Sequence, residues 1–379
     1  MTLNVERLTY ADAFETLLPE WEALDAGLSP RTPFTSPIWN QLWWKYFARR
    51  SILRRDECFV HALRDASGRL VAVAPLMLTH EPSFGPVRVR KVQFFGTDPS
   101  LTEIRGIVCP VERQGEVVDA LIGHFAGRGN NWDLLKWSGI RLDGKLHEKL
   151  LSSRYMRAGR TLPDYLICLP ASWTEFRSRL SNNTRKSLRK AHEFLDRDGH
   201  DVALRVTERH DELSEALERF FVLHTARAQA TDMARHRDSF AHWRHRKFVG
   251  ELVHRMGALH HLRVFQLEID GEIVASRIAF ALDQDLYLYF SGYDPKWRKY
   301  GIMTRLMVET IKWAIDVGFA RVNLSTGKDL SKLRWKPTEI GFQEAVQISP
   351  SLRGQVALRL ELGLRREGEA DMAGGPKED

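Results

Sequence analysis

A strand, a helix and a second strand follow one another within residues 285–326, and this order constrains the fold more than any other stretch of the sequence. In DLYLYFSG, Leu286, Leu288 and Phe290 alternate with their neighbours as they do along a strand. An amphipathic helix is predicted from about Ile302 to Val317, and ARVNLS predicts the strand after it. These elements predict a βαβ unit with parallel strands and a right-handed crossover.

The loop before that helix carries the features of an anion site. A helix start offers unpaired backbone N–H groups and the positive end of the helix dipole. Gly301 lacks a Cβ and lets the backbone approach a ligand closely, while Arg298 and Lys299 add positive charge. The loop contains neither the P-loop pattern nor the dinucleotide-binding G-x-G-x-x-G pattern. We therefore expect a phosphate or diphosphate ligand held by another kind of loop.

Two hairpins of similar pattern indicate that the chain is an internal duplication. CFVHALRDASGRLVAVAPLML and RVFQLEIDGEIVASRIAFAL each hold an apolar strand, an acidic residue with glycine, and Val-Ala in the return strand, so that 71–72 correspond to 274–275. A chain of 379 residues exceeds one ordinary domain. The predicted fold class is α/β (α+β), with two tandem halves that each hold a mixed, mostly antiparallel sheet flanked by helices.

Two further helices carry polar residues of open meaning. The helix over 184–195 is basic, and its cations are either a solvated face or a surface for an anionic substrate or nucleic acid. The helix over 211–230 places His224 and Arg227 near its apolar face, where a histidine serves packing or catalysis. No metal site is expected, because no carboxylate or cysteine accompanies His242 and His245.

Composition and charge bear on the expected partners and cellular location of the protein. A net charge of +7 and a pI of about 9.3 allow nucleic acid, an anionic membrane face or a phosphate-rich ligand. No stretch approaches the roughly 20 apolar residues of a membrane span, and no signal peptide is recognised. The three scattered cysteines fit reduced thiols, so we expect a cytoplasmic location.

The loop resembles the pyrophosphate-binding loop of GNAT-type acyltransferases, [Q/R]-x-x-G-x-[G/A]. Arg298 and Gly301 match it, whereas Met303 replaces the usual small residue. PFTSPIWNQLWW, SNNTRKSLRKAHEFL, FFVLHTARAQA, DGEIVAS, YFSGYDPKWRKYG and LSTGKDLSKLRW also come in an order similar to that of a bacterial two-domain acetyltransferase family associated with cellulose and exopolysaccharide biosynthesis. That family is distantly similar to the Fem-type peptidoglycan aminoacyltransferases.

The resemblance implies two GNAT-like halves, residues 1–165 and 166–364, with a disordered tail over 365–379. The first half lacks the loop, since FFGTDPSLTEIRG has no R-x-x-G-x-A. Acyl-CoA, in particular acetyl-CoA, is then the co-substrate of the second half, and it needs no metal.

The resemblance also implies roles for individual residues. Backbone N–H groups over 290–293 would polarise the thioester carbonyl. From residue type and position alone, we also expect His224 as the base and Tyr293 or Tyr289 as the acid. Ser331 stands before Lys332 where the family often has a tyrosine. Arg227 is expected to bind the acceptor. Lys328 and Lys332 either bind an anionic acceptor or CoA phosphates, or belong to a solvated loop of mixed charge. The residues expected to bind the co-substrate are Ser291, Gly292, Arg298, Lys299, Tyr300, Gly301, Ile302, Met303 and Thr304.

The expected activity is therefore acyl transfer from acyl-CoA to an amine or hydroxyl of a small-molecule or glycan-related acceptor. One alternative is a Fem-like transferase that uses aminoacyl-tRNA and touches RNA with the helix over 184–195. Another is a non-catalytic, nucleic-acid-binding protein with a GNAT fold. A nucleic-acid partner is not expected, because no recognisable nucleic-acid motif is present.

Overall fold

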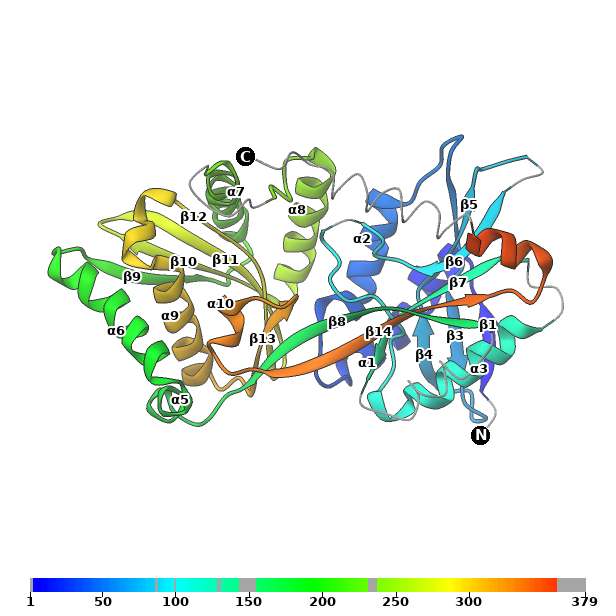
Figure 1. Ribbon diagram of the computed structural model, residues 1–379, viewed down its shortest axis with the longest axis horizontal. Coiled ribbons are helices and arrows are strands. Elements are labelled where there is room, and N and C mark those ends of the chain that lie inside the picture. Colours follow the sequence, from blue (N-terminus) through cyan, green and yellow to red (C-terminus); the bar gives the residue numbers. More distant parts are fainter. Residues whose placement is uncertain are drawn as a thin grey trace.

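The computed structural model describes residues 3–85, 88–98, 100–127, 131–142, 155–230 and 237–359. Within them an 11-stranded sheet runs β2-β5-β6-β7-β14-β8-β13-β12-β11-β10-β9, beside a 3-stranded sheet β1-β3-β4 (Figure 1). The predicted mixed α/β class with a mostly antiparallel sheet is confirmed. The residues expected to form a disordered tail, 365–379, lie outside the described ranges.

The second half is a sheet covered on both faces. Its strands are β9 (Val202–Thr207), β10 (Leu262–Ile269), β11 (Glu272–Leu282), β12 (Asp285–Tyr293) and β13 (Arg321–Thr326). One face packs on α5 (Trp173–Arg179), α6 (Asn182–Arg197) and α9 (Ile302–Val317). The other packs on α7 (Leu213–Gln229) and α8 (Trp243–Ala258). The predicted βαβ unit is present, since β12 and β13 are parallel and α9 connects them.

The first half repeats that crossover. β6 (Val89–Phe94) pairs in parallel with β7 (Leu134–Arg141), and α3 (Gln114–Ala126) joins them. The other elements of this half are β1 (Asn4–Arg7), α1 (Leu18–Ala26), α2 (Pro37–Phe47), β2 (Arg55–Cys58), β3 (His61–Arg64), β4 (Leu70–Ala74) and β5 (Leu76–Glu81). Each half thus places a hairpin before a strand, a helix and a parallel strand, as the predicted duplication requires.

Local signals in the sequence correctly located several elements. Ser36 caps α2, because its Oγ accepts the backbone N–H of Trp39 at 3.1 Å. The β10–β11 turn holds Asp270 and Gly271 at φ of +51° and +84°. The helix predicted over residues 11–29 is in fact a π-helical turn over Asp12–Thr16 followed by α1, with Pro19 in its first turn.

Two long strands join the halves into one sheet. β8 (Met156–Cys168) pairs with β13 of the second half, and β14 (Thr338–Ile348) pairs with both β8 and β7 of the first half. Figure 1 shows these strands crossing the middle of the molecule. A segment near the end of the chain therefore completes the sheet of the first half. The expected division at residue 165 falls within β8 and stays a prediction.

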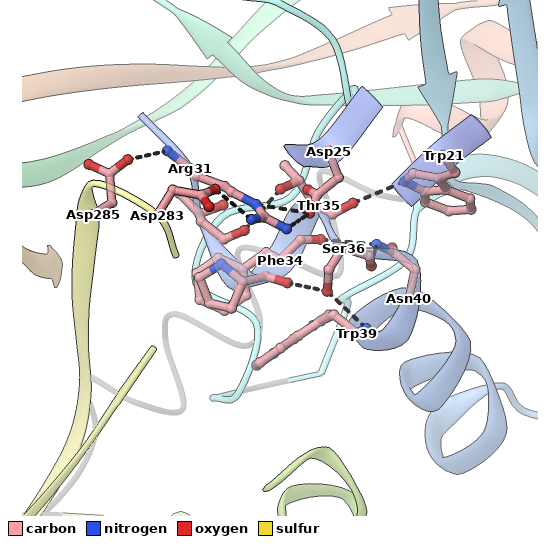
Figure 2. A network of polar contacts seen from close by, with 12 residues as sticks. Trp21, Asp25, Arg31, Phe34, Thr35, Ser36, Trp39, Asn40, Asp283 and Asp285 are labelled. Atoms are coloured by element: carbon pink, nitrogen blue, oxygen red, sulfur yellow. Dashed lines mark hydrogen bonds and ion pairs between the residues drawn. The ribbon is translucent and has the colours of Figure 1, made fainter. Parts of the chain in front are cut away.

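A buried arginine also fastens the halves together. Arg31 donates its backbone N–H to Asp285 at 2.9 Å and its guanidinium to Asp25 and to Asp283, both at 2.8 Å (Figure 2). Asp283 lies in the turn between β11 and β12, and Asp285 is the first residue of β12. Across the same interface, the ring of Trp39 in α2 lies 5.1 Å from that of Phe248 in α8. These contacts fix how β12, the strand that leads to the candidate site, meets the first half.

Candidate acyl-transfer site

The candidate site lies where β12 and β13 part. They pair from Asp285 with Arg321 to Tyr287 with Asn323. β12 then bulges, because Ser291 pairs with Arg277 whereas Leu288 pairs with Ala279, so that 289–290 face the single residue between those partners. A bulge bends its strand and leaves an extra residue outside the ladder. β12 and β13 therefore separate after Tyr287 and Asn323, and backbone groups of β12 become available at the gap between them.

A cavity of about 390 Å³ fills this gap. Its walls come from α7, from β11, β12 and β13, from the first two turns of α9, and from the segment after β13. The lining residues are Arg227, Arg277, Tyr289, Ser291, Tyr293, Met303, Thr304, Met307, Leu324, Ser325, Asp329, Ser331, Lys332, Arg334 and Trp335.

The start of α9 opens onto this cavity. Gly301 precedes the helix with φ of +66° and ψ of 35°, in the left-handed region that favours glycine, and no side chain caps the helix. A Cβ at this position would meet only the Ala191 side chain of α6, at 3.6 Å. No acidic residue stands in the first turn of α9. The exposed Arg298 and Lys299 lie in the 3-10 helix Pro295–Tyr300, directly before Gly301. The region therefore favours an anion.

The other expected co-substrate residues divide into two groups. Ser291, Met303 and Thr304 line the cavity. Ile302 is buried in the hydrophobic core. Tyr300 is buried as well, and its hydroxyl donates to Asp198 at 2.9 Å and lies 3.2 Å from His200 Nε2. Tyr300 thus anchors the loop to the end of α6, while Arg298 and Lys299 beside it are exposed.

Gly292 packs against α7 and does not line the cavity. A Cβ there would overlap the backbone nitrogen of His224 and would lie 2.6 Å from the carbonyl carbon of Leu223. The glycine therefore allows α7 to approach β12 closely. Contact with the co-substrate, which the sequence suggested for Gly292, has no support in this geometry.

The base role expected for His224 also has no support. The side chain is fully buried, its Nδ1–H donates to the Ser291 carbonyl at 3.0 Å, and Nε2 accepts the backbone N–H of Ser239 at 3.3 Å. Burial lowers the pKa of His224. Both ring nitrogens are thus engaged, and the residue holds the end of the β12 bulge in place.

The two candidate acids differ in their surroundings. Tyr289 is buried, and its hydroxyl donates to the Leu101 carbonyl of the first half at 2.6 Å. Burial raises its pKa well above the usual value, so Tyr289 is a poor proton donor. Tyr293, at the end of β12, is buried as well, and both tyrosines line the cavity, but the Arg227 guanidinium lies 5.5 Å from the Tyr293 ring centre. Tyr293 is the better placed of the two.

Of the expected acceptor-binding residues, Arg227 and Lys332 line the cavity, whereas the exposed Lys328 lies on the loop after β13, outside the lining. Lys332 donates to Ser325 Oγ at 3.0 Å and to the backbone carbonyls of Ser325 and Thr326. It therefore holds the end of β13 in place as well as contributing charge. Arg334, which sequence reasoning missed, donates to Thr304 at 3.4 Å and to Ser187 of α6 at 2.8 Å.

Two carboxyl groups that contact β12 and β13, the half-buried Glu103 and the buried Asp164, also escaped prediction. Glu103 comes from the first half and accepts hydrogen bonds from the Tyr287 hydroxyl and from the Thr326 N–H. Burial raises its pKa to about 7 and that of Asp164, which accepts from Asn323 at 2.7 Å, to about 6. Neither has a sequence signal, because both come from segments remote from the loop. Asp329, in contrast, lines the cavity itself.

Comparison with known proteins agrees with this placement. A family model described as an acetyltransferase (GNAT) domain matches residues 182–336, which contain β12, the loop, α9 and β13. That part of the chain is therefore similar to GNAT acetyltransferase domains. No curated protein matches the sequence significantly.

Among solved structures, that of FemX has a TM-score of 0.58 at 10% identity, over 90% of this chain and 96% of that one. The fold is thus shared with FemX over both halves. The C-terminal domain of a putative lysylphosphatidylglycerol synthetase from Agrobacterium fabrum has a TM-score of 0.48 at 12% identity, over 85% and 90% of the chains. A tandem GNAT protein from the clavulanic acid pathway gives 0.41 at 11% identity, over 92% and 99%.

Neither a metal site nor a membrane-spanning helix is found within the described ranges. No group of three His, Cys, Asp or Glu side chains is placed to hold a metal ion there. Likewise, no helix in those ranges has the length and apolar character needed to cross a bilayer.

Proposed function

We propose that the protein transfers an acyl group from acyl-CoA, in particular acetyl-CoA, to an amine or hydroxyl of a small or glycan-related acceptor. One observation carries the proposal. The cavity at the β12–β13 gap opens on an uncapped, basic helix start, inside the region that resembles a GNAT domain.

The residues present fit the phosphates of CoA. The first N–H groups of α9 would receive the pyrophosphate, with a dipole contribution of about 0.3–1 kcal/mol. Gly301 leaves its approach open, and the exposed Arg298 and Lys299 directly precede it. Arg334, held against Thr304, adds a third cation on the opposite wall. Each charge-assisted hydrogen bond contributes about 1.5–3 kcal/mol.

The chemistry follows from what faces the gap. Backbone N–H groups of the bulged part of β12, held by His224, would stabilise the oxyanion that forms on the thioester carbon. Tyr293 would protonate the departing thiolate, and Asp329 would take the proton of the acceptor. Asp329→Asn keeps an N-cap for the short helix α10 (Leu330–Leu333) but removes the charge, so turnover should fall about 100-fold or more while acetyl-CoA affinity is kept.

The direct test is isothermal titration of the full chain with acetyl-CoA, followed by a thiol-release assay with amine and hydroxyl acceptors. Binding with release of free CoA supports the proposal. The absence of binding to a folded chain overturns it.

A second candidate is transfer from aminoacyl-tRNA. The fold shared with FemX and the exposed Lys186, Arg189 and Lys190 of α6, beside the start of α9, favour it. Tight tRNA binding with a steep dependence on salt would support this candidate, or non-catalytic nucleic-acid binding if no transfer follows. The cytoplasmic location and the association with exopolysaccharide biosynthesis stay predictions.

A further inference from the structure

One wall of the cavity holds an arginine that the protein itself does not neutralise. Arg277 lies on β11 opposite Ser291 of β12 and lines the cavity. Its Nε is buried, and among the residues that the structure describes no hydrogen-bond partner reaches it. No carboxylate of the described ranges pairs with this guanidinium. A buried guanidinium nitrogen without a partner is costly, so this arrangement points to a ligand that binds there.

A second arginine from α7 stands beside it. Arg227 donates through one terminal nitrogen to Ser291 Oγ at 3.1 Å, and its Nε is also buried without a partner in the described residues. Burial and the neighbouring Arg227 lower the pKa of Arg277 to about 10. Burial likewise lowers the pKa of Arg227. Arg277 thus experiences the positive charge of Arg227, and both guanidinium groups line the same cavity.

The remaining walls do not balance this charge. Lys332 and Arg334 add two more cations, although both are bonded to protein oxygens. Asp329 is the carboxylate of the lining, and it accepts the Ser331 N–H at 2.7 Å. Two planar guanidinium groups without carboxylate partners match the geometry of a carboxylate or phosphate, which accepts two parallel hydrogen bonds from such a fork.

We propose that Arg227 and Arg277 form an anion subsite that holds an acidic group of the acyl acceptor next to the reacting carbonyl. This assignment rests on the proposed function. Both arginines contact or face Ser291, in the part of β12 whose N–H groups would hold the thioester oxygen. The CoA phosphates are separated from the thioester by the whole pantetheine arm, and the start of α9 already supplies their donors. The acceptor is therefore an acidic amine or alcohol, such as an amino acid or an acidic sugar.

The test compares Arg277→Met with the wild-type chain in thermal melts, with sodium acetate or sodium phosphate measured against sodium chloride of equal ionic strength. In zwitterionic buffer the variant should melt no lower than wild type, because a buried donor without a partner is gone. Acetate should raise the Tm of wild type. The apparent acetate affinity taken from this rise should be at least tenfold weaker in Arg277→Met. Arg277→Lys should keep part of the response, and Arg205→Met, on exposed β9, should keep all of it. An unchanged acetate response in Arg277→Met overturns the subsite.

Acetyl-CoA affinity separates this inference from the proposed function. Arg277→Met should bind acetyl-CoA within about threefold of wild type. A loss of tenfold or more would assign Arg277 to CoA and refute an acceptor subsite. The acidic group could instead belong to the acyl chain. Wild type would then bind succinyl-CoA at least tenfold more tightly than acetyl-CoA, and Arg277→Met would show no such preference. That result would also refute the acceptor subsite. If acetyl-CoA binds neither protein while the acetate response depends on Arg277, the proposed function fails and the anion subsite stands.

Discussion

The two halves contain the same crossover with opposite charge at its start. In the second half, Arg298 and Lys299 precede an uncapped α9 that begins after a left-handed glycine. In the first half, Glu112 and Glu116 lie at the start of α3, and Arg113 between them is already paired with Glu116. An anion at α3 would meet two carboxylates, whereas an anion at α9 would meet two cations.

The loops after the parallel strands differ in the same sense. After β6, Asp98 accepts the backbone N–H of Thr102 at 3.0 Å and the indole N–H of Trp43 at 2.7 Å. The protein's own carboxylate therefore occupies donors that a phosphate could otherwise use. The comparison teaches that a duplicated fold keeps its topology while a few charges decide which copy can bind an anion.

The largest expected effect is on stability, from adding a Cβ to a glycine in the crossover of each half. Gly292→Ala should destabilise the protein by at least about 3 kcal/mol, because the new Cβ overlaps the backbone of α7. Gly123→Ala in α3 of the first half meets nothing within 4 Å and should stabilise by about 1 kcal/mol. Urea unfolding measures both. Equal small effects would show that α7 does not pack on β12 in this way.

The junction between the halves should give a pH-dependent stability. The pKa of Glu103 is about 7 in the folded chain, above its ordinary 4.5, so the folded state binds the proton more tightly. Stability from this group is present below pH 4.5 and is lost as pH rises to 7. Glu103→Gln does not titrate, so its stability relative to wild type should be greater at pH 8 than at pH 5, by at most about 3 kcal/mol.

Urea unfolding at these two pH values measures that difference. The exposed Glu112→Gln at the start of α3 should change stability by less than about 0.5 kcal/mol at both. A pH-independent effect of Glu103→Gln would mean that Glu103 is solvated in the folded chain.

The charge at the two helix starts should matter only in the second half. Arg298→Ala should weaken acetyl-CoA binding about ten- to a hundredfold, which corresponds to about 1.5–3 kcal/mol, because one charge-assisted contact is lost. Arg113→Ala, before α3, should leave the affinity unchanged. Isothermal titration measures the acetyl-CoA affinity of both variants. Equal losses of affinity would contradict the proposed difference between the two helix starts.

The smallest effect is expected on α6. Neutralising Arg185, Lys186, Arg189 and Lys190 together should change stability by less than about 0.5 kcal/mol for each residue, because the buried side of the helix is Leu188, Ala191 and Leu195. Acetyl-CoA affinity should stay near wild type. A selective loss of tRNA binding in a filter assay would instead support the tRNA-dependent alternative.

The sequence predicted those parts of the fold in which a local pattern decides the outcome. The alternation before Gly292 and the apolar face of α9 required a strand and a helix in that order, and both are present. The pairing of β14 with β7 carries no local signal, because the paired residues are more than 200 positions apart in the sequence. For the same reason, the predicted assignment of all of residues 166–364 to the second half did not include the pairing of β14 with β7 of the first half.

The candidate site divides in the same way. The glycine and cations of the loop are adjacent in the chain and could be recognised together. Glu103, Arg277 and Arg334 come from three remote segments, and only the folded chain places them near one gap. His224 shows the limit of residue type as evidence, because its position on the apolar face of α7 already suited a buried packing role.

The central claim is that one chain binds one acyl-CoA, at the start of α9. Calorimetric titration with acetyl-CoA should give a stoichiometry near one for wild type and no measurable binding for Gly301→Val. Gly318→Val is the matched control, since Gly318 also has positive φ, at +96°, but ends the same helix. Both variants carry backbone strain of about 1–3 kcal/mol, so melts must show that both are folded. Binding by Gly318→Val but not by Gly301→Val is the predicted result, whereas two sites per wild-type chain, or wild-type affinity in Gly301→Val, would contradict the account.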